Sequence, residues 1–217
     1  LRRKLIKGRK KPNITYTINP LKYHSRDPEI FTIEDFISNS DCEHIKKLAK
    51  PLLKRAVVSG DKKGYISEHR TNSNCWINKK DKIVSNIIKR IADLVELPEK
   101  NAESMQVIYY DKNQQYKNHY DGWDDDNSVK SKRLLENGGQ RLKTVLCYLN
   151  DVKDGGETEF PQLKLKIKPE KKKLIAFSNV YPGTNKKHLK SEHCGCPIKK
   201  GKKWAFNVWF RERENMK

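Results

Sequence analysis

The sequence lacks any long run of apolar residues. No stretch approaches the length that a membrane-spanning helix needs, so the chain is not predicted to cross a membrane. Apolar residues make up only 35% of the 217 positions, but they are clustered, and nine tyrosines and four tryptophans accompany them. Clustering of this kind predicts a folded domain rather than a disordered chain, and the length suits one domain with a substantial core and a short extension.

Acidic residues are also few relative to basic ones. Lysine and arginine total 47 against 27 aspartates and glutamates, which gives a formal charge of +20. Such a charge attracts polyanions nonspecifically, so nucleic acid is a partner to consider. The lysines are spread along the chain, with local clusters at 171–173, 199–200 and 202–203, and no zinc finger or other nucleic-acid motif lies near them. A solvated basic surface is therefore the favoured interpretation.

Cysteine is scarce and odd in number, with five residues in the chain. At least one thiol therefore has no partner within a monomer, and the redox compartment stays open. Cys194 and Cys196 are one residue apart, a spacing that favours two thiols, or two separate partners, over a mutual bridge. A zinc cluster of these two with His188 and His193 can be written down, but its spacing fits no common structural zinc pattern.

The first residues give little information about targeting. The chain begins with Leu1 rather than methionine, so we expect a trimmed or processed form. Residues 1–11 are basic and lack the apolar segment of a signal peptide. Asn13-Ile-Thr15 has the pattern of a glycosylation sequon, which by itself does not fix a compartment.

Two amphipathic helices are predicted in the first half of the chain. Asp41 suits the N-cap of a helix that ends near Pro51. Its apolar residues recur at helical spacing: Ile45, Leu48, Ala49 and Leu52. A second helix is expected from about Lys80 to Leu97, where Pro98 stops it. Both helices are expected to pack on a sheet.

Short β-rich runs replace the helical pattern from residue 105 onward. Strands are predicted at Met105–Tyr110, Gln115–Tyr120, Leu142–Leu149, Leu163–Ile167, Lys173–Phe177 and Trp204–Phe210. The stretch from Gly122 to Gly139 has no regular periodicity and is interpreted as a loop, either covering a substrate or simply exposed. The predicted fold class is mainly β with flanking α-helices, as a sandwich or barrel.

Two histidines and one aspartate form a candidate metal site. His119 and Asp121 are two residues apart, so on a strand their side chains would project from the same face and grip one ion. His193 can supply the third ligand. Two histidines with one carboxylate are the ligand set of non-haem iron(II) oxygenases, in which the remaining octahedral positions are open. A surface hydrogen bond between His119 and Asp121 is the alternative.

The segments around these residues resemble one known family. They are, in order, Met105–Tyr110, Gln114–Asp121, Arg141–Leu149, Gly155–Pro161, and Ser191–Pro197 followed by Gly201–Trp204. Together with Arg70-Thr-Asn-Ser73 and Trp76, they resemble the catalytic domain of the prolyl 4-hydroxylases, the iron(II)- and 2-oxoglutarate-dependent enzymes typified by the collagen-modifying type. The resemblance runs from about Phe31 to Arg211. It implies a double-stranded β-helix, or jelly-roll, core.

The resemblance also implies a domain organisation. Residues 1–30 would form a basic N-terminal extension, and residues 31–217 the catalytic domain. Within that domain, helices are expected in about 41–97 and the jelly-roll core in about 105–211.

The resemblance assigns roles to individual positions. His119, Asp121 and His193 match the iron ligands, and Lys203 matches the lysine that pairs with the far carboxylate of 2-oxoglutarate. Two hydroxyl groups, those of Tyr110 and Thr158, match groups that hydrogen-bond the same carboxylate. Four residues match positions that line the substrate groove: Arg70, Tyr116, Arg141 and Trp209. The aromatic and hydroxyl-bearing residues have a competing interpretation as core residues, and Arg141 as the structural partner of an acidic loop.

A few positions depart from the family pattern. Asn113 stands where glycine is usual, a benign change because asparagine tolerates a left-handed turn. Asn72 replaces a serine. Glu192 and Cys194 flank His193 where leucine and alanine are usual, which brings a charge and an oxidisable thiol near the metal ligands. These changes put the substrate preference in doubt.

The predicted activity is hydroxylation of peptidyl proline with iron(II), dioxygen and 2-oxoglutarate, giving succinate and carbon dioxide, with ascorbate as reductant. The expected substrate is a proline-rich or collagen-like peptide or protein. Two alternatives stay open: an oxygenase acting on another residue or a nucleic-acid base, and a noncatalytic module that binds a peptide or polyanion. Resemblance to collagen-type enzymes would place the chain in the lumen of the secretory pathway, whereas the residues leave compartment and oligomeric state open.

Overall fold

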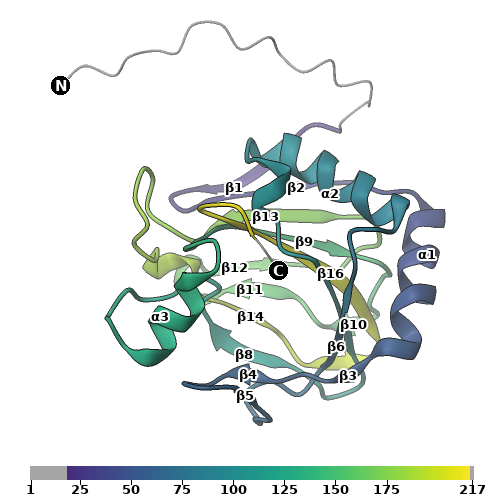
Figure 1. The fold of residues 1–217 in the computed structure, drawn as a ribbon. Coiled ribbons are helices and arrows are strands. Elements are labelled where there is room, and N and C mark those ends of the chain that lie inside the picture. Colours follow the sequence, from purple (N-terminus) through teal and green to yellow (C-terminus); the bar gives the residue numbers. More distant parts are fainter. Residues whose placement is uncertain (1–18, 216–217) are drawn as a thin grey trace, which may run out of the picture.

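Two facing antiparallel sheets form the body of the molecule (Figure 1). The structure is a computed structural model that describes residues 19–215, so residues 1–18, including the sequon at Asn13, lie outside the described residues. The larger sheet contains, in spatial order, β1 (Lys22–Arg26), β2 (Glu29–Ile33), β13 (Leu174–Ser178), β9 (Arg141–Tyr148), β16 (Lys203–Arg211), β7 (Met105–Tyr110), β6 (Ser73–Ile77) and β3 (Lys54–Arg55). The smaller sheet contains β12 (Leu165–Ile167), β11 (Thr158–Phe160), β14 (His193–Gly195) and β8 (Tyr116–His119).

Several shorter elements lie outside these two sheets. Two further strand pairs are β10 (Asp154–Gly155) with β15 (Ile198–Lys200), and β4 (Val58–Ser59) with β5 (Gly64–Tyr65). Single 3₁₀ turns lie at Lys50–Leu52, Glu99–Asn101, Pro161–Leu163 and Leu189–Ser191. No helix among residues 19–215 is both long enough and apolar enough to cross a membrane.

Alternation along the central strands builds two separate cores. On β7, Val107 faces a core shared with the helices, while Ile108 and Tyr110 face a core between the two sheets. On β9, Cys147 faces the core shared with the helices, and Tyr148 faces the core between the two sheets. Successive strand residues point to opposite faces, so a sheet that is covered on both sides needs apolar residues in both sets. The mainly β class with a jelly-roll core is confirmed.

Helices α1 (Asn39–Ala49) and α2 (Lys82–Val95) pack on the outer face of the large sheet (Figure 1). Helix α2 starts at Asp81, whose carboxylate accepts the backbone N–H groups of Ile83 and Val84, close to the predicted start. For α1 the predicted N-cap was wrong. Ser38 is the N-cap, and Asp41 occupies the third helical position, where its carboxylate accepts the Ser38 N–H in a capping box.

All six predicted strands are present, with Met105–Tyr110 matching residue for residue and the others displaced by one or two positions. The stretch 122–139 is not wholly a loop, because helix α3 (Val129–Glu136) forms within it, capped by Ser128. Eight mostly polar residues carry too short a pattern to reveal such a helix. The sheet also begins at Lys22, before the boundary at residue 31, because β1 is short, polar and half-exposed.

Candidate metal centre and adjoining cavity

The smaller sheet brings the two histidines of the site together. His119 is the last residue of β8, and it pairs in register with His193, the first residue of β14. Asp121 lies two residues beyond the strand, so the expectation that it shares a strand with His119 was wrong. The turn at residues 120–121 nevertheless returns the Asp121 carboxylate to the histidines. Its oxygens lie 3.8 Å from His119 Nε2 and 3.5 Å from His193 Nε2.

Each histidine is oriented by a backbone carbonyl. His119 Nδ1 lies 2.8 Å from the Lys117 oxygen, and His193 Nδ1 lies 2.9 Å from the Ser191 oxygen. A carbonyl can only accept, so each Nδ1 carries the proton and each Nε2 presents a lone pair. The Tyr116 ring stacks on His119 with its centroid 3.5 Å away, which fixes the plane of that imidazole.

The charge states of His119 and Asp121 suit a cation. Burial, helped by nearby His193, lowers the pKa of His119 to about 3, so this imidazole is neutral at physiological pH. Burial alone would raise the pKa of Asp121, but His193, His119 and then Arg141 outweigh it and lower that pKa to about 2. The carboxylate is therefore ionised. One ligand atom from each of the three side chains lies within 4.8 Å of the other two, close enough for a single ion to reach all three.

Two residues that sequence reasoning did not single out hold Asp121 in place. Thr144 Oγ1 on β9 donates to Asp121 Oδ2 at 2.8 Å. Asn179 Nδ2 donates in turn to Thr144 Oγ1 at 2.8 Å. All three side chains are buried. Hydrogen bonds of this kind orient a metal-binding carboxylate, but they join positions 23 and 35 residues apart and are invisible as a local pattern.

A buried lysine lies at the closed end of the site. Lys203 begins β16, where it pairs with Tyr110 of β7, and only 1% of its surface is exposed. Its Nζ donates to the Gly156 carbonyl at 2.8 Å, and no carboxylate of residues 19–215 forms an ion pair with that nitrogen. Burial lowers the pKa of Lys203 to about 8. A cation held in this way is suited to receive an anionic ligand.

Hydroxyl groups surround this lysine. The Thr158 hydroxyl lies 2.7 Å from the Tyr148 hydroxyl, and burial raises the pKa of both Tyr110 and Tyr148, so both phenols stay protonated. Tyr110 and Thr158 line the same cavity as Lys203, and the Lys203 Nζ lies 5.1 Å from the centre of the Tyr110 ring. Tyr148 lies in the matched segment Arg141–Leu149, and the family resemblance assigns it no role; its hydrogen bond with the Thr158 hydroxyl orients that group.

The open side of the site is formed by aromatic rings with arginines stacked on them. The Arg70 guanidinium lies 4.7 Å from the centre of the Tyr116 ring and donates to Asn72 and Gln106. The Arg141 guanidinium lies 3.8 Å from the centre of the Trp209 ring.

Arg141 is tied to a buried carboxylate. It makes a bidentate pair with Glu103 at 2.7 and 2.8 Å, and Arg211 Nε donates to the same side chain at 2.6 Å. The predicted alternative partner, the acidic loop, is therefore not its partner.

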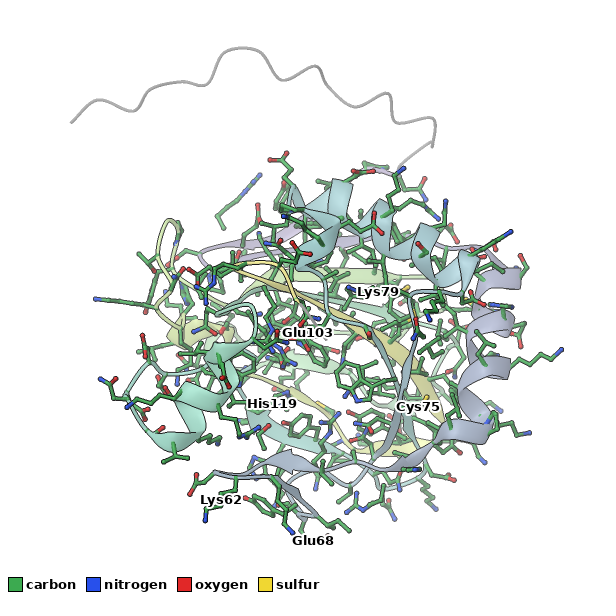
Figure 2. The ribbon with its side chains drawn as sticks, in the orientation of Figure 1. Lys62, Glu68, Cys75, Lys79, Glu103 and His119 are labelled. Atoms are coloured by element: carbon green, nitrogen blue, oxygen red, sulfur yellow. The ribbon has the colours of Figure 1, made fainter. Side chains whose placement is uncertain are left out.

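Figure 2 shows Glu103 and His119 toward the α3 side of the molecule, with Cys75 toward α1.

One cavity of about 800 Å³ joins all these groups. The ten residues singled out from the sequence all line it: Arg70, Tyr110, Tyr116, His119, Asp121, Arg141, Thr158, His193, Lys203 and Trp209. The β4–β5 hairpin and helix α3 border its mouth. His188, part of the discarded zinc cluster, instead lies with Nε2 2.8 Å from Asp27 Oδ1.

The donor set fits iron(II). Two imidazoles and one carboxylate on one side of a cavity leave room for further ligands, as in non-haem iron(II) oxygenases. A structural zinc site would instead be closed by a fourth protein ligand. The cavity therefore combines a metal centre, a buried cation and an aromatic wall.

Comparison with known proteins agrees with this geometry. Residues 105–211 match the family model described as the 2OG-Fe(II) oxygenase superfamily. The chain is 35% identical over 212 residues to prolyl 4-hydroxylase 5 of Arabidopsis thaliana, covering 88% of this chain and 70% of that protein. It is 36% identical over 185 residues to a putative prolyl 4-hydroxylase of Acanthamoeba polyphaga mimivirus, covering 85% and 74%.

Solved structures give the same result. The viral collagen prolyl hydroxylase of Paramecium Bursaria Chlorella virus-1, determined as a 2OG complex, is 30% identical with a TM-score of 0.66, covering 84% of this chain and 95% of that one. A prolyl-4-hydroxylase of Pseudomonas putida, at 15% identity and a TM-score of 0.56, shares the fold.

Proposed function

This chain belongs to the prolyl 4-hydroxylase family of iron(II)- and 2-oxoglutarate-dependent dioxygenases, and we propose that it hydroxylates proline at carbon 4 within a peptide or protein through the cavity described above. One observation carries the assignment of residues. A two-histidine, one-carboxylate cluster and a buried lysine line the same cavity, which opens to the surface between aromatic side chains.

His119, Asp121 and His193 would hold the iron(II). When bound, the metal supplies the oxidative chemistry, in which one atom of dioxygen enters succinate as 2-oxoglutarate loses carbon dioxide, and the other enters the substrate as hydroxyl. The chain keeps both imidazoles in the tautomer that presents Nε2 and keeps Asp121 ionised. Thr144 and Asn179 hold the carboxylate in one orientation.

Lys203 would pair with the far carboxylate of 2-oxoglutarate. Its ammonium is a compact charge in a water-poor pocket, where a single ion pair is strong. Tyr110 and Thr158 would donate hydrogen bonds to the same carboxylate, with Tyr148 orienting the threonine hydroxyl.

Tyr116 and Trp209 would form the surface for the proline ring. Proline-rich segments form an extended helix without internal hydrogen bonds, and aromatic grooves recognise it. Arg70 and Arg141 stack on these rings while their donors bind other protein groups, so we assign them to positioning the aromatic wall. Collagen-like and other proline-rich sequences both fit this description, and ascorbate would return oxidised iron to iron(II).

The test is succinate release from 2-oxoglutarate with iron(II) and ascorbate, with and without a proline-rich peptide. Collagen-like and non-collagen proline-rich peptides are compared, and mass spectrometry locates any added oxygen. We expect peptide-stimulated turnover with one oxygen on proline. Turnover with oxygen elsewhere, or only in the presence of a nucleic acid, would overturn the substrate class. Binding of peptide without any succinate release from iron-loaded protein would indicate a noncatalytic module.

A further inference from the structure

A second group of metal-binding side chains lies on the other face of the strand that carries His193. Along β14 the residues alternate, so His193 faces the iron site, and a side-chain carbon built on Gly195 would lie 3.3 Å from the Tyr110 hydroxyl. Cys194, the next residue of β14, and Cys196, just beyond the strand, line a surface depression of about 460 Å³, and Cys194 also borders the iron-site cavity. Glu159 of the neighbouring strand β11 pairs in register with Cys194. The proposed iron chemistry uses none of these three side chains.

The three side chains converge. Cys194 Sγ lies 3.9 Å from Cys196 Sγ, and Cys196 Sγ lies 3.3 Å from Glu159 Oε2. One ligand atom from each lies within 4.8 Å of the other two, and all three residues are partly buried. Both thiols are free, so they are available as ligands.

These separations match a tetrahedral ion. Two thiolates about 2.3 Å from such an ion lie about 3.8 Å apart, and a thiolate and a carboxylate oxygen lie about 3.5 Å apart. Two adjacent sulfur donors favour zinc-like cations over magnesium or calcium, which prefer oxygen. A disulfide would need the sulfurs at about 2.05 Å instead.

We propose that Glu159, Cys194 and Cys196 form a second metal site that binds a thiophilic divalent cation such as Zn²⁺, separate from the iron site. Binding breaks both S–H bonds, releases the two protons to solvent, and forms two metal–sulfur bonds and one metal–oxygen bond. Water completes the fourth position on the exposed side. No electron is transferred.

One basic side chain competes for the carboxylate. Lys166 Nζ lies 3.4 Å from Glu159 Oε2, but 61% of the Lys166 side chain is exposed, so it can move into solvent when a cation binds. The thiols have no such competitor among the ion pairs of the described residues. The site therefore needs only a movement of Lys166 to open.

Cobalt(II) can test the site, because only thiolate ligands give an intense near-ultraviolet charge-transfer band. We would titrate the reduced full chain with Co²⁺ in a thiol-free reductant, alongside His119→Ala, which weakens the iron site. Both proteins should show the band. Cys194→Ser and Cys196→Ser should each weaken it, the double variant should remove it, and Glu159→Gln should raise the Kd for Co²⁺ about tenfold or more. Glu192→Gln, on the other side of His193, is the matched control and should bind normally.

A second readout is protection of the thiols. Zn²⁺ should shield Cys194 and Cys196 of the His119→Ala variant from alkylation, measured by peptide mass spectrometry. Circular dichroism confirms that each variant is folded. Absence of the band in reduced, folded protein would overturn the proposal, and so would a band that survives in Cys194→Ser/Cys196→Ser. Neither readout requires hydroxylase activity, so this site and the proposed function fail or succeed separately.

Discussion

The closed end of the cavity is lined by side chains of paired strands, whereas its open end is also bordered by a two-stranded hairpin and a short helix. Lys203, Tyr110 and Thr158 are each at most 3% exposed. At the mouth, Tyr65 of the β4–β5 hairpin is 56% exposed, and Trp76 of β6 is 46% exposed. Strands in a sheet fix side chains closely and loops do not, so the closed end suits an invariant co-substrate and the open end suits a variable peptide.

His119→Ala should affect both ends, because the metal lies between them. We expect hydroxylation and uncoupled succinate release both to fall by at least about 10³-fold, since even loss of a residue that only supports a ligand costs about 10–100-fold. Succinate release with and without peptide measures this. His44→Ala, a histidine paired with Asp81 at the N-terminus of α2, is the control and should keep full activity. Substantial turnover by His119→Ala would remove His119 from the ligand set.

Lys203→Ala should affect the closed end alone. We expect the KM for 2-oxoglutarate to rise about 100-fold, because truncating one partner of a buried ion pair costs about 2–5 kcal/mol. The KM for peptide should change little. Steady-state kinetics in each substrate separates the two. Lys202→Ala is the matched control, because the neighbouring side chain is 61% exposed. Equal losses in both KM values would contradict the separation of the two ends.

Thr144→Val tests the support of Asp121. The change keeps the shape of the side chain but removes the donor to Oδ2, so the affinity for iron(II) should fall about 10–30-fold. The iron(II) concentration that gives half-maximal activity measures this affinity. Thr32→Val, which removes a buried hydroxyl that contacts His24 instead, should leave the iron dependence unchanged. An unchanged requirement in Thr144→Val would show that Asp121 needs no such support.

The pH dependence of 2-oxoglutarate binding should report on Lys203. Its pKa is lowered to about 8 by burial, so the ammonium is charged below that pH and neutral above it. The KM for 2-oxoglutarate should therefore be flat below pH 8 and rise about tenfold per pH unit above it. Lys203→Arg stays charged throughout, so its profile should be flat whatever its absolute level. A flat profile for the wild type would contradict the role of this cation.

The sequence predicted the strands at the closed end more accurately than the helix at the open end, for a physical reason. The roles of Tyr110 and Lys203 came from the family resemblance. The run Met105–Tyr110 is rich in β-forming residues, and β7 matches the predicted strand residue for residue. Helix α3 has eight mostly polar residues and no such signal. The contacts of Asp121 with Thr144, and of Arg141 with Glu103, join distant parts of the chain and follow only from the fold. The sequence could therefore identify Asp121 and Arg141 as candidate site residues, but it could not identify the side chains that hold them.

Arg133 connects two of the elements that border the open end of the cavity, so a substitution there tests whether the order of that end matters. From α3 it donates to the backbone oxygens of Gly60 and Asp61 at 2.7 and 3.0 Å, and thereby joins the helix to the β4–β5 hairpin beside the cavity mouth. Arg133→Ala removes both hydrogen bonds but leaves every residue that we assign to peptide binding in place. The hairpin and α3 should therefore become less ordered, with no direct contact to the peptide lost.

We expect the KM for peptide in Arg133→Ala to rise about threefold to tenfold, which corresponds to about 1 kcal/mol of lost preorganisation, while the KM for 2-oxoglutarate stays the same. Lys132→Ala, an exposed neighbour on the same helix, controls for a general effect on α3. Hydrogen exchange should be faster in 58–65 and 129–136 only. If the KM for 2-oxoglutarate rose in parallel, order at the mouth would extend to the closed end, and the two ends would act as one unit.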